Sequence, residues 1–472
     1  MPTFTGPFSL NPSQTDNFQT NFGTVHLRNL FEVGAARYYV TVATEGSNAG
    51  GQNTGNIWIQ KSVNKGITWT LVYNGPEGAE MIAAQVVGTA IYIFGGNFNT
   101  SDNSIWVWKF DTGTDSMVSA TKLSAIHDTL LGRGIAASSF NDGKILVSYY
   151  DTVNGGPACV LYDPVTNTIS AVTDLTAFFT GTSPGVMYSV VDPISDLCIV
   201  FILSIAASVP DVWAIVVDEL LNRQNAVLVY SLPITGAPFN EIWLSQGVPT
   251  VSGGVVIVPY INPIAQSGGS QTVLFVVRST VATLLAFSSP ETVANEVMPP
   301  EWMWTFQSEQ PYGWGVVADG MGTLYAFYTV NANFNDDGTS HTQVWYRTST
   351  TPGVWSAPVN LLNAPMPSSG LSIYPFELAS GAIGVSIAYV DPVLYGGPNP
   401  NDQYNALTVV YFESGSPTPP GPTGPGIASA ANFQVLPGVG RYCRYKLTKP
   451  KNAIAKFMKV GKGIYYPRDF VR

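Results

Sequence analysis

Short apolar runs dominate this sequence, and clusters of turn-forming residues separate them. Val, Ile, Tyr, Phe and Trp are frequent in the runs, whereas Gly, Asn, Asp and Pro mark their ends. Segment 134–175 contains four such runs, GIAASSF, KILVSYY, ACVLYDP and TISAVTDL, with NDGK and PVTN as hairpin turns. β-Branched and aromatic residues favour extended backbone, while Gly and Asn tolerate the positive φ of tight hairpins. The pattern predicts an all-β protein built from antiparallel meanders.

Runs of this kind group into seven units of roughly 56 residues each, close to the repeat length of β-propellers with longer loops. Charged residues make up only 11% of the chain, which also contains 46 Gly and 34 Pro, as expected for many short strands punctuated by turns. A closed ring of antiparallel sheets removes the exposed edges of a long open β chain. We therefore predict a single β-propeller of about seven four-stranded blades, with counts of six and eight left open. The last unit is one strand short, and we expect an N-terminal segment near residues 20–30 to complete it.

Residues 62–69 form a distinctive turn between two apolar runs. Ser62, Asn64, Gly66, Thr68 and Trp69 match the pattern Ser-x-Asp-x-Gly-x-Thr-Trp, with Asn in place of Asp. This motif resembles the Asp-box of sialidase-type β-propellers. In that family the box joins the third and fourth strands of a blade and is structural, and the resemblance implies the same here. The alternative is an ordinary hairpin turn, in which Asn and Gly supply the positive φ.

A sialidase resemblance would imply an arginine triad, a Tyr/Glu nucleophile pair and an Asp acid. The family's first arginine stands in an Arg-Ile-Pro step, whereas Arg37 is followed by Tyr-Tyr. We therefore expect no enzyme, no catalytic residue and no cofactor. The alternative is a glycan-cleaving hydrolase with two acids on innermost strands, and the candidates for such a pair are Asp151, Asp192, Asp319 and Asp391.

We predict no metal site. The three histidines, His26, His127 and His341, are far apart in sequence, and Cys159, Cys198 and Cys443 form no Cys-x-x-Cys pair. The loop from Asn333 to His341 has clustered oxygen ligands but lacks the full alternating pattern and the distal Glu of a calcium loop. A polar hairpin loop is the favoured interpretation, and calcium binding is the alternative.

An aromatic cluster is the most suggestive binding feature. It lies in the segment PPEWMWTFQSEQPYGWG and contains Trp302, Trp304, Tyr312 and Trp314. Sugars stack on aromatic faces, so we predict glycan contact for these residues, with burial in a core between blades as the alternative.

The chain changes character after Glu413. We predict an N-terminal arm over 1–23, a propeller over 24–413, a Pro/Gly-rich linker over 414–430 and a short irregular, basic anchor over 431–472. The last segment has ten of the 21 Lys and Arg residues and one acid, Asp469. Its net charge is thus +9, which leaves −19 for the rest of a chain whose total is −10. The basic residues predicted to serve assembly are Arg441, Arg444, Lys446, Lys449, Lys451, Lys456, Lys459 and Lys462.

The anchor also contains aromatic residues, which favours docking on a protein over a solvated arm. Nucleic acid is not expected as a partner, because the acidic body would repel it, and the longest apolar run is too short for a membrane helix. The N-terminus has no signal-peptide pattern, and low charge with many small polar residues resembles a bacteriophage structural protein. We therefore expect a non-enzymatic virion protein, made in the host cytoplasm, that binds a host surface or glycan. It would dock on other virion proteins through its tail and form a homo-oligomer; a non-viral protein-interaction scaffold is the other alternative.

Overall fold

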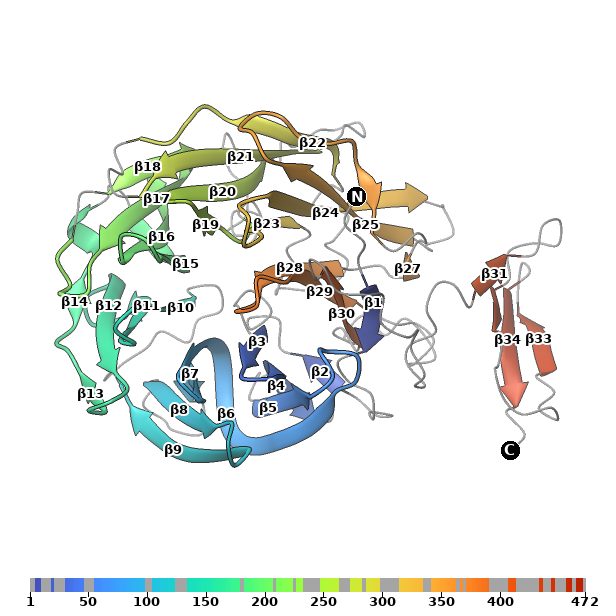
Figure 1. Ribbon diagram of the computed structural model, residues 1–472, viewed down its shortest axis with the longest axis horizontal. Coiled ribbons are helices and arrows are strands. Elements are labelled where there is room, and N and C mark those ends of the chain that lie inside the picture. The colour runs from blue at the N-terminus through green and yellow to red at the C-terminus, as the bar shows by residue number, and fades with distance from the viewer. Residues whose placement is uncertain are drawn as a thin grey trace.

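The described strands form seven antiparallel blades arranged in a ring, as seen in the computed structural model (Figure 1). The structure describes residues 5–9, 18–20, 30–45, 55–97, 104–123, 134–178, 182–206, 209–223, 226–231, 247–262, 272–281, 286–297, 314–333, 341–361, 366–367, 371–389, 406–412, 433–435, 443–445, 456–460 and 464–469. The predicted all-β propeller with about seven four-stranded blades is confirmed.

Blades 1 and 2 share one long strand, β6, whose first part is the outer strand of blade 1 and whose second part is the inner strand of blade 2. Blade 1 consists of β3 (Leu30–Val33), β4 (Ala36–Glu45), β5 (Gly55–Ser62) and the start of β6 (Thr70–Val87), and β2 (Phe18–Thr20) also pairs with β4. Blade 2 continues through β7 (Ala90–Asn97), β8 (Ile105–Asp111) and β9 (Ser116–Lys122).

Blades 3 to 5 are simple meanders, in which consecutive strands pair. Blade 3 contains β10 (Ile135–Ser139), β11 (Ile145–Asp151), β12 (Gly156–Asp163) and β13 (Thr168–Ile169), with β14 (Thr173–Asp174) also on β12 and the 3-10 helix η2 (Thr176–Phe178) after it. Blade 4 contains β15 (Thr182–Asp192), β16 (Leu197–Ala206), β17 (Val209–Val217) and β18 (Val227–Ser231). Blade 5 contains β19 (Thr250–Ser252), β20 (Val255–Asn262), β21 (Thr272–Thr280) and β22 (Glu291–Val297).

Blade 7 closes the ring with a strand from the other end of the chain. Blade 6 contains β23 (Trp314–Ala318), β24 (Leu324–Asn333), β25 (His341–Ser349) and β26 (Val359–Asn360), with β27 (Met366–Pro367) also on β25. Blade 7 contains β28 (Leu371–Glu377), β29 (Ile383–Tyr389), β30 (Ala406–Phe412) and β1 (Thr5–Ser9). The predicted closure by an N-terminal strand is therefore found, but β1 supplies it rather than residues 20–30. Part of the segment predicted as an arm thus belongs to the ring.

The core lies between blades, and both faces of each sheet are buried. On β16, Cys198, Val200 and Ile202 pack in the cluster shared with blade 3. The alternate residues Ile199, Phe201 and Leu203 pack in the cluster on the opposite face of that sheet. Because side chains alternate across a strand, this double burial explains why the sequence is continuously apolar there. No helix among the described residues is long and apolar enough to cross a membrane.

The C-terminal segment contains two hairpins, where the sequence predicted irregular structure. β31 (Phe433–Val435) pairs with β32 (Cys443–Tyr445), and β33 (Lys456–Val460) pairs with β34 (Ile464–Asp469). Runs such as KFMKV and IYYPR are short and do not alternate apolar with charged residues, so the sequence alone does not distinguish them from a coil. In Figure 1 these hairpins lie beside the ring rather than within it.

Removal of residues 1–9 tests the closure of the ring. The deletion leaves the edge of β30 unpaired, and at about 1 kcal/mol for each lost backbone hydrogen bond we expect a few kcal/mol of destabilisation. Chemical denaturation of the full and shortened chains measures it. An unchanged free energy of unfolding would show that β1 is dispensable for closure.

Candidate functional site

One face of the ring consists of short turns, which we call the turn face. It carries the turns between the first and second strands of each blade and, in blades 1 to 6, the connections between the third and fourth strands. Neighbouring turns contact each other: Asn141, between β10 and β11, donates its backbone N–H to Asp196 Oδ1, between β15 and β16, at 2.8 Å. Gly320 and Gly381, in the equivalent turns of blades 6 and 7, also lie in contact. Such contacts place these turns on the same side of the ring.

The turn from Ser62 to Trp69 joins the third and fourth strands of blade 1, and its own side chains hold it closed. The Ser62 hydroxyl donates to Asn64 Oδ1 (2.9 Å) and accepts from the Gly66 N–H (2.8 Å). Asn64 Oδ1 also accepts from the Thr68 N–H at 2.9 Å. Trp69 is buried beneath the turn, and its indole N–H donates to the Gly66 carbonyl at 2.9 Å. Each position of the motif therefore makes a contact that its side-chain chemistry explains.

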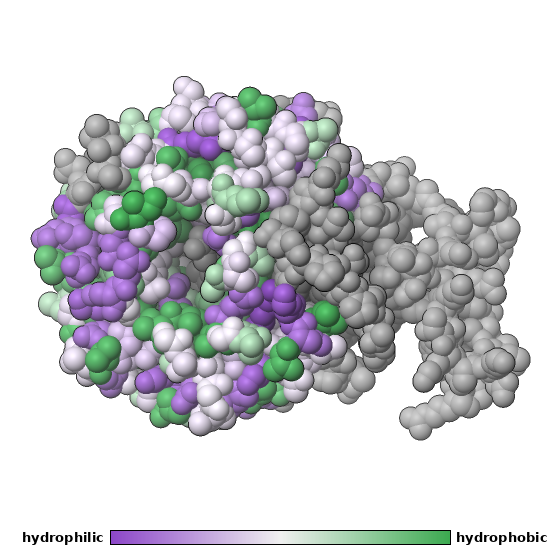
Figure 2. Space-filling model, viewed as in Figure 1, coloured by the Kyte–Doolittle hydropathy of each residue, from purple (hydrophilic) through white to green (hydrophobic). Residues whose placement is uncertain are grey.

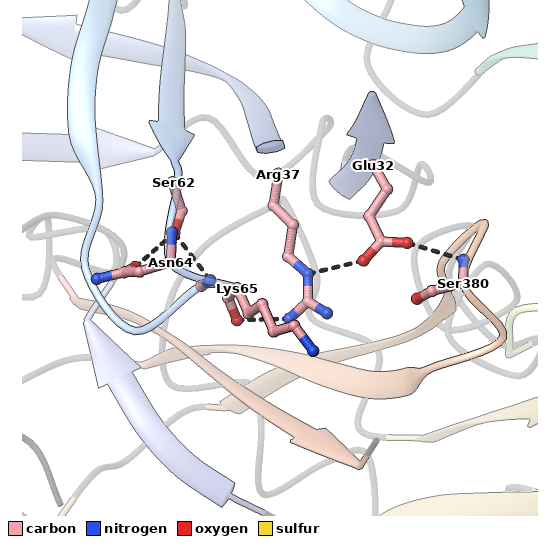
Figure 3. Close-up of polar contacts among 7 residues, drawn as sticks. Glu32, Arg37, Ser62, Asn64, Lys65 and Ser380 are labelled. Carbon is pink, nitrogen blue, oxygen red and sulfur yellow. Dashed lines mark hydrogen bonds and ion pairs between the residues drawn. The ribbon is translucent and has the colours of Figure 1, made fainter. Parts of the chain in front are cut away.

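A buried ion pair connects this turn to the seam between blades 1 and 7 (Figure 3). Arg37 Nε lies 3.0 Å from Glu32 Oε1, and the Arg37 guanidinium also donates to the Lys65 carbonyl. The other carboxylate oxygen of Glu32 accepts from the Ser380 N–H of blade 7 at 2.8 Å. Arg37 and Glu32 thus connect the first hairpin of blade 1, the Ser62–Trp69 turn and the last blade.

The other described arginines of the body are also engaged by protein groups. Arg278, on β21, makes two hydrogen bonds with Glu291, at 2.8 Å and 3.0 Å. Arg347, on β25, donates to the Tyr328 hydroxyl and to the Ser356 carbonyl. Arg223 donates to the Asp174 carbonyl and lies over the Phe178 ring. Arg28 and Arg133 lie outside the described residues.

The carboxylates considered for catalysis bind the backbone of their own turns. Asp151 accepts from the Val153 N–H at 2.9 Å, and Asp319 accepts from the Met321 and Thr323 N–H groups at 2.9 Å and 2.8 Å. Asp192 is buried and accepts from residues 194 and 195. These side chains shape hairpins as Asx turns. Asp391 lies outside the described residues.

A cavity of about 140 Å³ lies against the inner strands of blades 2 to 4 and residues 248–249 before β19. Its polar groups are amide and hydroxyl groups that belong to Gln85, Ser138, Ser139, Tyr188 and Ser189. Ser138 and Ser189 share a hydrogen bond of 2.8 Å between blades, and Gln85 donates to the Ala137 carbonyl at 2.7 Å. Ala, Val and Pro residues form the rest of the described lining, which contains no Asp, Glu, Lys, Arg or His. The cavity suits an uncharged polar group.

The aromatic residues predicted to contact glycans do not form a described site. Trp314 is fully buried on β23, and its ring packs so closely on residue 247 that only glycine fits there. Its ring is therefore not available for stacking on a sugar in this structure. Trp302, Trp304 and Tyr312 lie outside the described residues.

The predicted assembly residues are described only in part. Arg444 lies on β32, and Lys456 and Lys459 lie on β33. Arg441, Lys446, Lys449, Lys451 and Lys462 lie outside the described residues.

The described part of the chain contains no group of three or more His, Cys, Asp or Glu residues placed to hold a metal ion. Cys159 and Cys198 are buried, and burial raises the pKa of the Cys159 thiol to about 12 and that of Cys198 further still. Both thiols are therefore protonated and unreactive at neutral pH. Positions 334–340, within the loop considered for calcium, lie outside the described residues.

The cavity against the inner strands of blades 2 to 4 was not predicted from the sequence. Its lining residues come from four segments far apart in sequence, and each segment reads as an ordinary strand of small and apolar residues. The runs QVV at 85–87, AASS at 136–139 and YSVV at 188–191 do contain polar residues in inner strands, where full burial would favour apolar ones. These polar residues in inner strands were the sequence feature that could have indicated the cavity.

Comparison with solved structures gives propellers of several kinds at low sequence identity. AofleA from Arthrobotrys oligospora is 14% identical with a TM-score of 0.41, covering 75% of this chain and 94% of that chain. The endosialidase of phage phi92 is 10% identical with a TM-score of 0.45 (100% and 75% covered). The NanB sialidase of Streptococcus pneumoniae is 11% identical with a TM-score of 0.43 (87% and 70% covered). No protein-family model and no curated protein matches the sequence.

Substitution of Asn64 tests the side-chain closure of the first turn. Asn64→Ala removes the acceptor used by Ser62 and Thr68, so we expect a loss of about 1–2 kcal/mol in the free energy of unfolding. Asn64→Asp retains that oxygen and should stay close to the parent protein. Urea denaturation of both variants gives the comparison, and equal losses would contradict the assigned role of Oδ1.

Because Arg37 and Glu32 form a buried ion pair, we expect substitutions of the two residues to have non-additive effects on the free energy of unfolding. Arg37→Met leaves the Glu32 carboxylate without its cation, which should cost about 3–5 kcal/mol. Adding Glu32→Gln should recover part of that loss, because the amide is neutral and can still accept from the Ser380 N–H. A double-mutant cycle measured by denaturation gives the coupling, and additive losses would mean that the two side chains act independently.

Proposed function

We propose that this chain is a non-enzymatic attachment protein of a virus particle. Its propeller body would hold an uncharged, hydroxyl-rich ligand such as a glycan on the host surface. Its basic C-terminal segment would dock it to other particle proteins. The neutral cavity on the inner strands is the observation that carries this proposal.

The chemistry of the cavity favours glycan binding. Hydroxyl and amide groups both donate and accept, as sugar hydroxyls do, so Ser138, Ser189 and Gln85 can exchange their present hydrogen bonds for bonds to a ligand. At about 140 Å³ the cavity is smaller than the ~300–1,000 Å³ of sites that enclose a drug-sized ligand. One end group of a larger glycan is therefore the appropriate occupant.

The use of the charged groups favours binding over cleavage. Glycoside hydrolysis generally needs two carboxyl groups on opposite sides of the bond to be cleaved. Asp151, Asp192 and Asp319 instead accept backbone hydrogen bonds within their turns. Arg37 and Arg278 have carboxylate partners of their own.

The Ser62–Trp69 turn belongs to the same proposal as a structural element. We interpret it as an Asp-box in which Asn64 replaces aspartate, because Oδ1, the atom shared by the two residues, makes the closing contacts with Ser62 and Thr68. In this interpretation the turn stabilises blade 1 and takes no part in ligand binding.

The experiment measures binding and turnover on the same samples. The full chain is titrated calorimetrically with a panel of neutral and sialylated oligosaccharides, and the release of new reducing ends is followed. We expect binding without release. Ser138→Ala with Ser189→Ala should weaken binding about tenfold, since each lost hydrogen bond is worth roughly 0.5–1.5 kcal/mol.

A matched control comes from the same blade. Ser148→Ala removes a buried hydroxyl that lies off the cavity, so it should leave saccharide affinity unchanged. Release of reducing ends that Asp192→Asn or Asp319→Asn abolishes would replace the proposal with the hydrolase alternative. Failure to bind any saccharide of the panel would remove the glycan part and favour a protein-interaction scaffold.

A further inference from the structure

Blades 3 and 4 present a mixed acidic and apolar surface on the turn face. It is formed by four neighbouring turns, 141–144, 163–167, 193–196 and 218–223, which we call the blade 3–4 patch. In Figure 2, the surface in view shows hydrophobic residues as separate spots among hydrophilic ones around the ring.

The four turns form one continuous surface. Asn141 bonds to the Pro193 carbonyl at 3.1 Å as well as to Asp196, which joins the turns of the two blades. The hydrogen bond with Asp142 raises the pKa of Lys144, and weaker electrostatic interactions with Glu219 and Asp163 add to that rise. The third-to-fourth-strand turns therefore lie close to the first-to-second-strand turn of blade 3.

Three aliphatic side chains point outward from the patch. Val165 is 88% exposed, and Ile194 and Leu220 are each 72% exposed. In each case the backbone N–H of the aliphatic residue donates to the carboxylate two positions before it, which belongs to Asp163, Asp192 or Asp218. This repeated Asx turn fixes the apolar residue at the tip, where it cannot fold back into the core.

The patch is negatively charged. Its five carboxylates, Asp142, Asp163, Asp196, Asp218 and Glu219, outnumber its two cations, Lys144 and Arg223. Apolar tips surrounded by carboxylates suit a partner that is both basic and apolar. Residues 431–472 have that chemistry, with a net charge of +9 and six aromatic residues, Tyr442, Tyr445, Phe457, Tyr465, Tyr466 and Phe470.

The last strand before the C-terminal segment ends on the turn face of the ring. β30 ends at Phe412, which pairs with Ile383 directly after the turn between β28 and β29, so the chain leaves blade 7 at the turn face. Blades 3 and 4 lie across the ring from blade 7, and the pairs β31–β32 and β33–β34 lie beside the ring (Figure 1). The chain therefore leaves its ring on the face that carries the patch, at a blade on the opposite side of the ring.

We propose that the blade 3–4 patch docks the C-terminal segment, residues 431–472, of a second copy of this chain. The inference rests on the proposed function in one respect, the role of the basic segment in docking, and it names the first partner as another copy. The contact is heterologous, since a different surface of each copy takes part, and it produces rings or chains of molecules.

The test is the mass of the full chain by sedimentation equilibrium over a series of concentrations and salt concentrations. We expect concentration-dependent association that weakens with salt, because the attraction is partly between exposed charges. The triple substitution Val165→Ser, Ile194→Ser and Leu220→Ser should weaken association at least about tenfold. The matched control, Val63→Ser, Met321→Ser and Val354→Ser, changes three tips that are similarly exposed on other blades and should not weaken it.

A charge exchange checks the same contact from both sides. Glu219→Lys should weaken association, and adding Lys459→Glu in the same chain should restore it in part. All variants should retain the parent melting temperature, since the changed residues lie at turn tips or in the C-terminal segment. Equal weakening by both triple substitutions would overturn the assignment to the blade 3–4 patch.

A full chain that stays monomeric over the whole series would overturn docking to a second copy. Crosslinks between the patch and the C-terminal segment within one chain would then assign the contact to the same molecule. Saccharide titration of the same variants separates this inference from the proposed function. If the chain associates but binds no saccharide, glycan attachment is rejected and the docking proposal stands. If it binds saccharide but does not associate, the docking proposal is rejected and glycan attachment stands.

Discussion

The burial of both faces of every blade is the constraint on which this structure depends. The second strands have no solvent-facing side: on β24, Ala326 and Tyr328 pack toward blade 5, while Tyr325 and Phe327 pack toward blade 7. A blade with only one neighbour would expose an entire apolar face, so the stack of sheets is stable only when it closes. Closure in turn requires a first and a last blade that recognise each other, and β1 with the Glu32–Ser380 contact provides this recognition.

The scarcity of charge has a related physical cause. Between two packed sheets an ionised side chain needs a partner, so the few buried charges occur as pairs such as Arg37 with Glu32 or as acceptors of backbone N–H groups. Aspartate at a strand end serves the second purpose in blades 3, 4 and 6, where it binds the N–H two residues later. In each of these turns one carboxylate oxygen is already engaged by the backbone. The same residues thus have a structural use in shaping the turns.

The fold could be predicted from the sequence because its determinants are local. Turn residues and strand-length apolar runs indicated the meander of blade 3 almost strand by strand. The closing strand was predicted near residues 20–30, whereas the structure shows that β1, Thr5–Ser9, closes the ring. The position was missed because β1 pairs with a strand about 400 residues away, and such a pairing leaves no local sequence signal. Trp314 shows the same limit at the candidate site. Its burial depends on the absence of a side chain at Gly247, which precedes blade 5, and no pattern within its own segment indicates that contact.

The two faces of the ring differ in the lengths of their strand connections. On the turn face, the connections between first and second strands have only two to five residues, and side-chain hydrogen bonds close those between Asp192 and Leu197 and between Asp319 and Leu324. Connections between second and third strands vary much more in length, from two residues between Ala206 and Val209 to a long segment between Tyr389 and Ala406. Rigid, regular turns suit a docking surface because little conformational entropy is lost when they bind. Length variation suits ligand recognition, since loops can change without disturbing the sheets that carry them. The proposed docking on the turn face would leave the opposite face, with its more variable loops, open to a ligand.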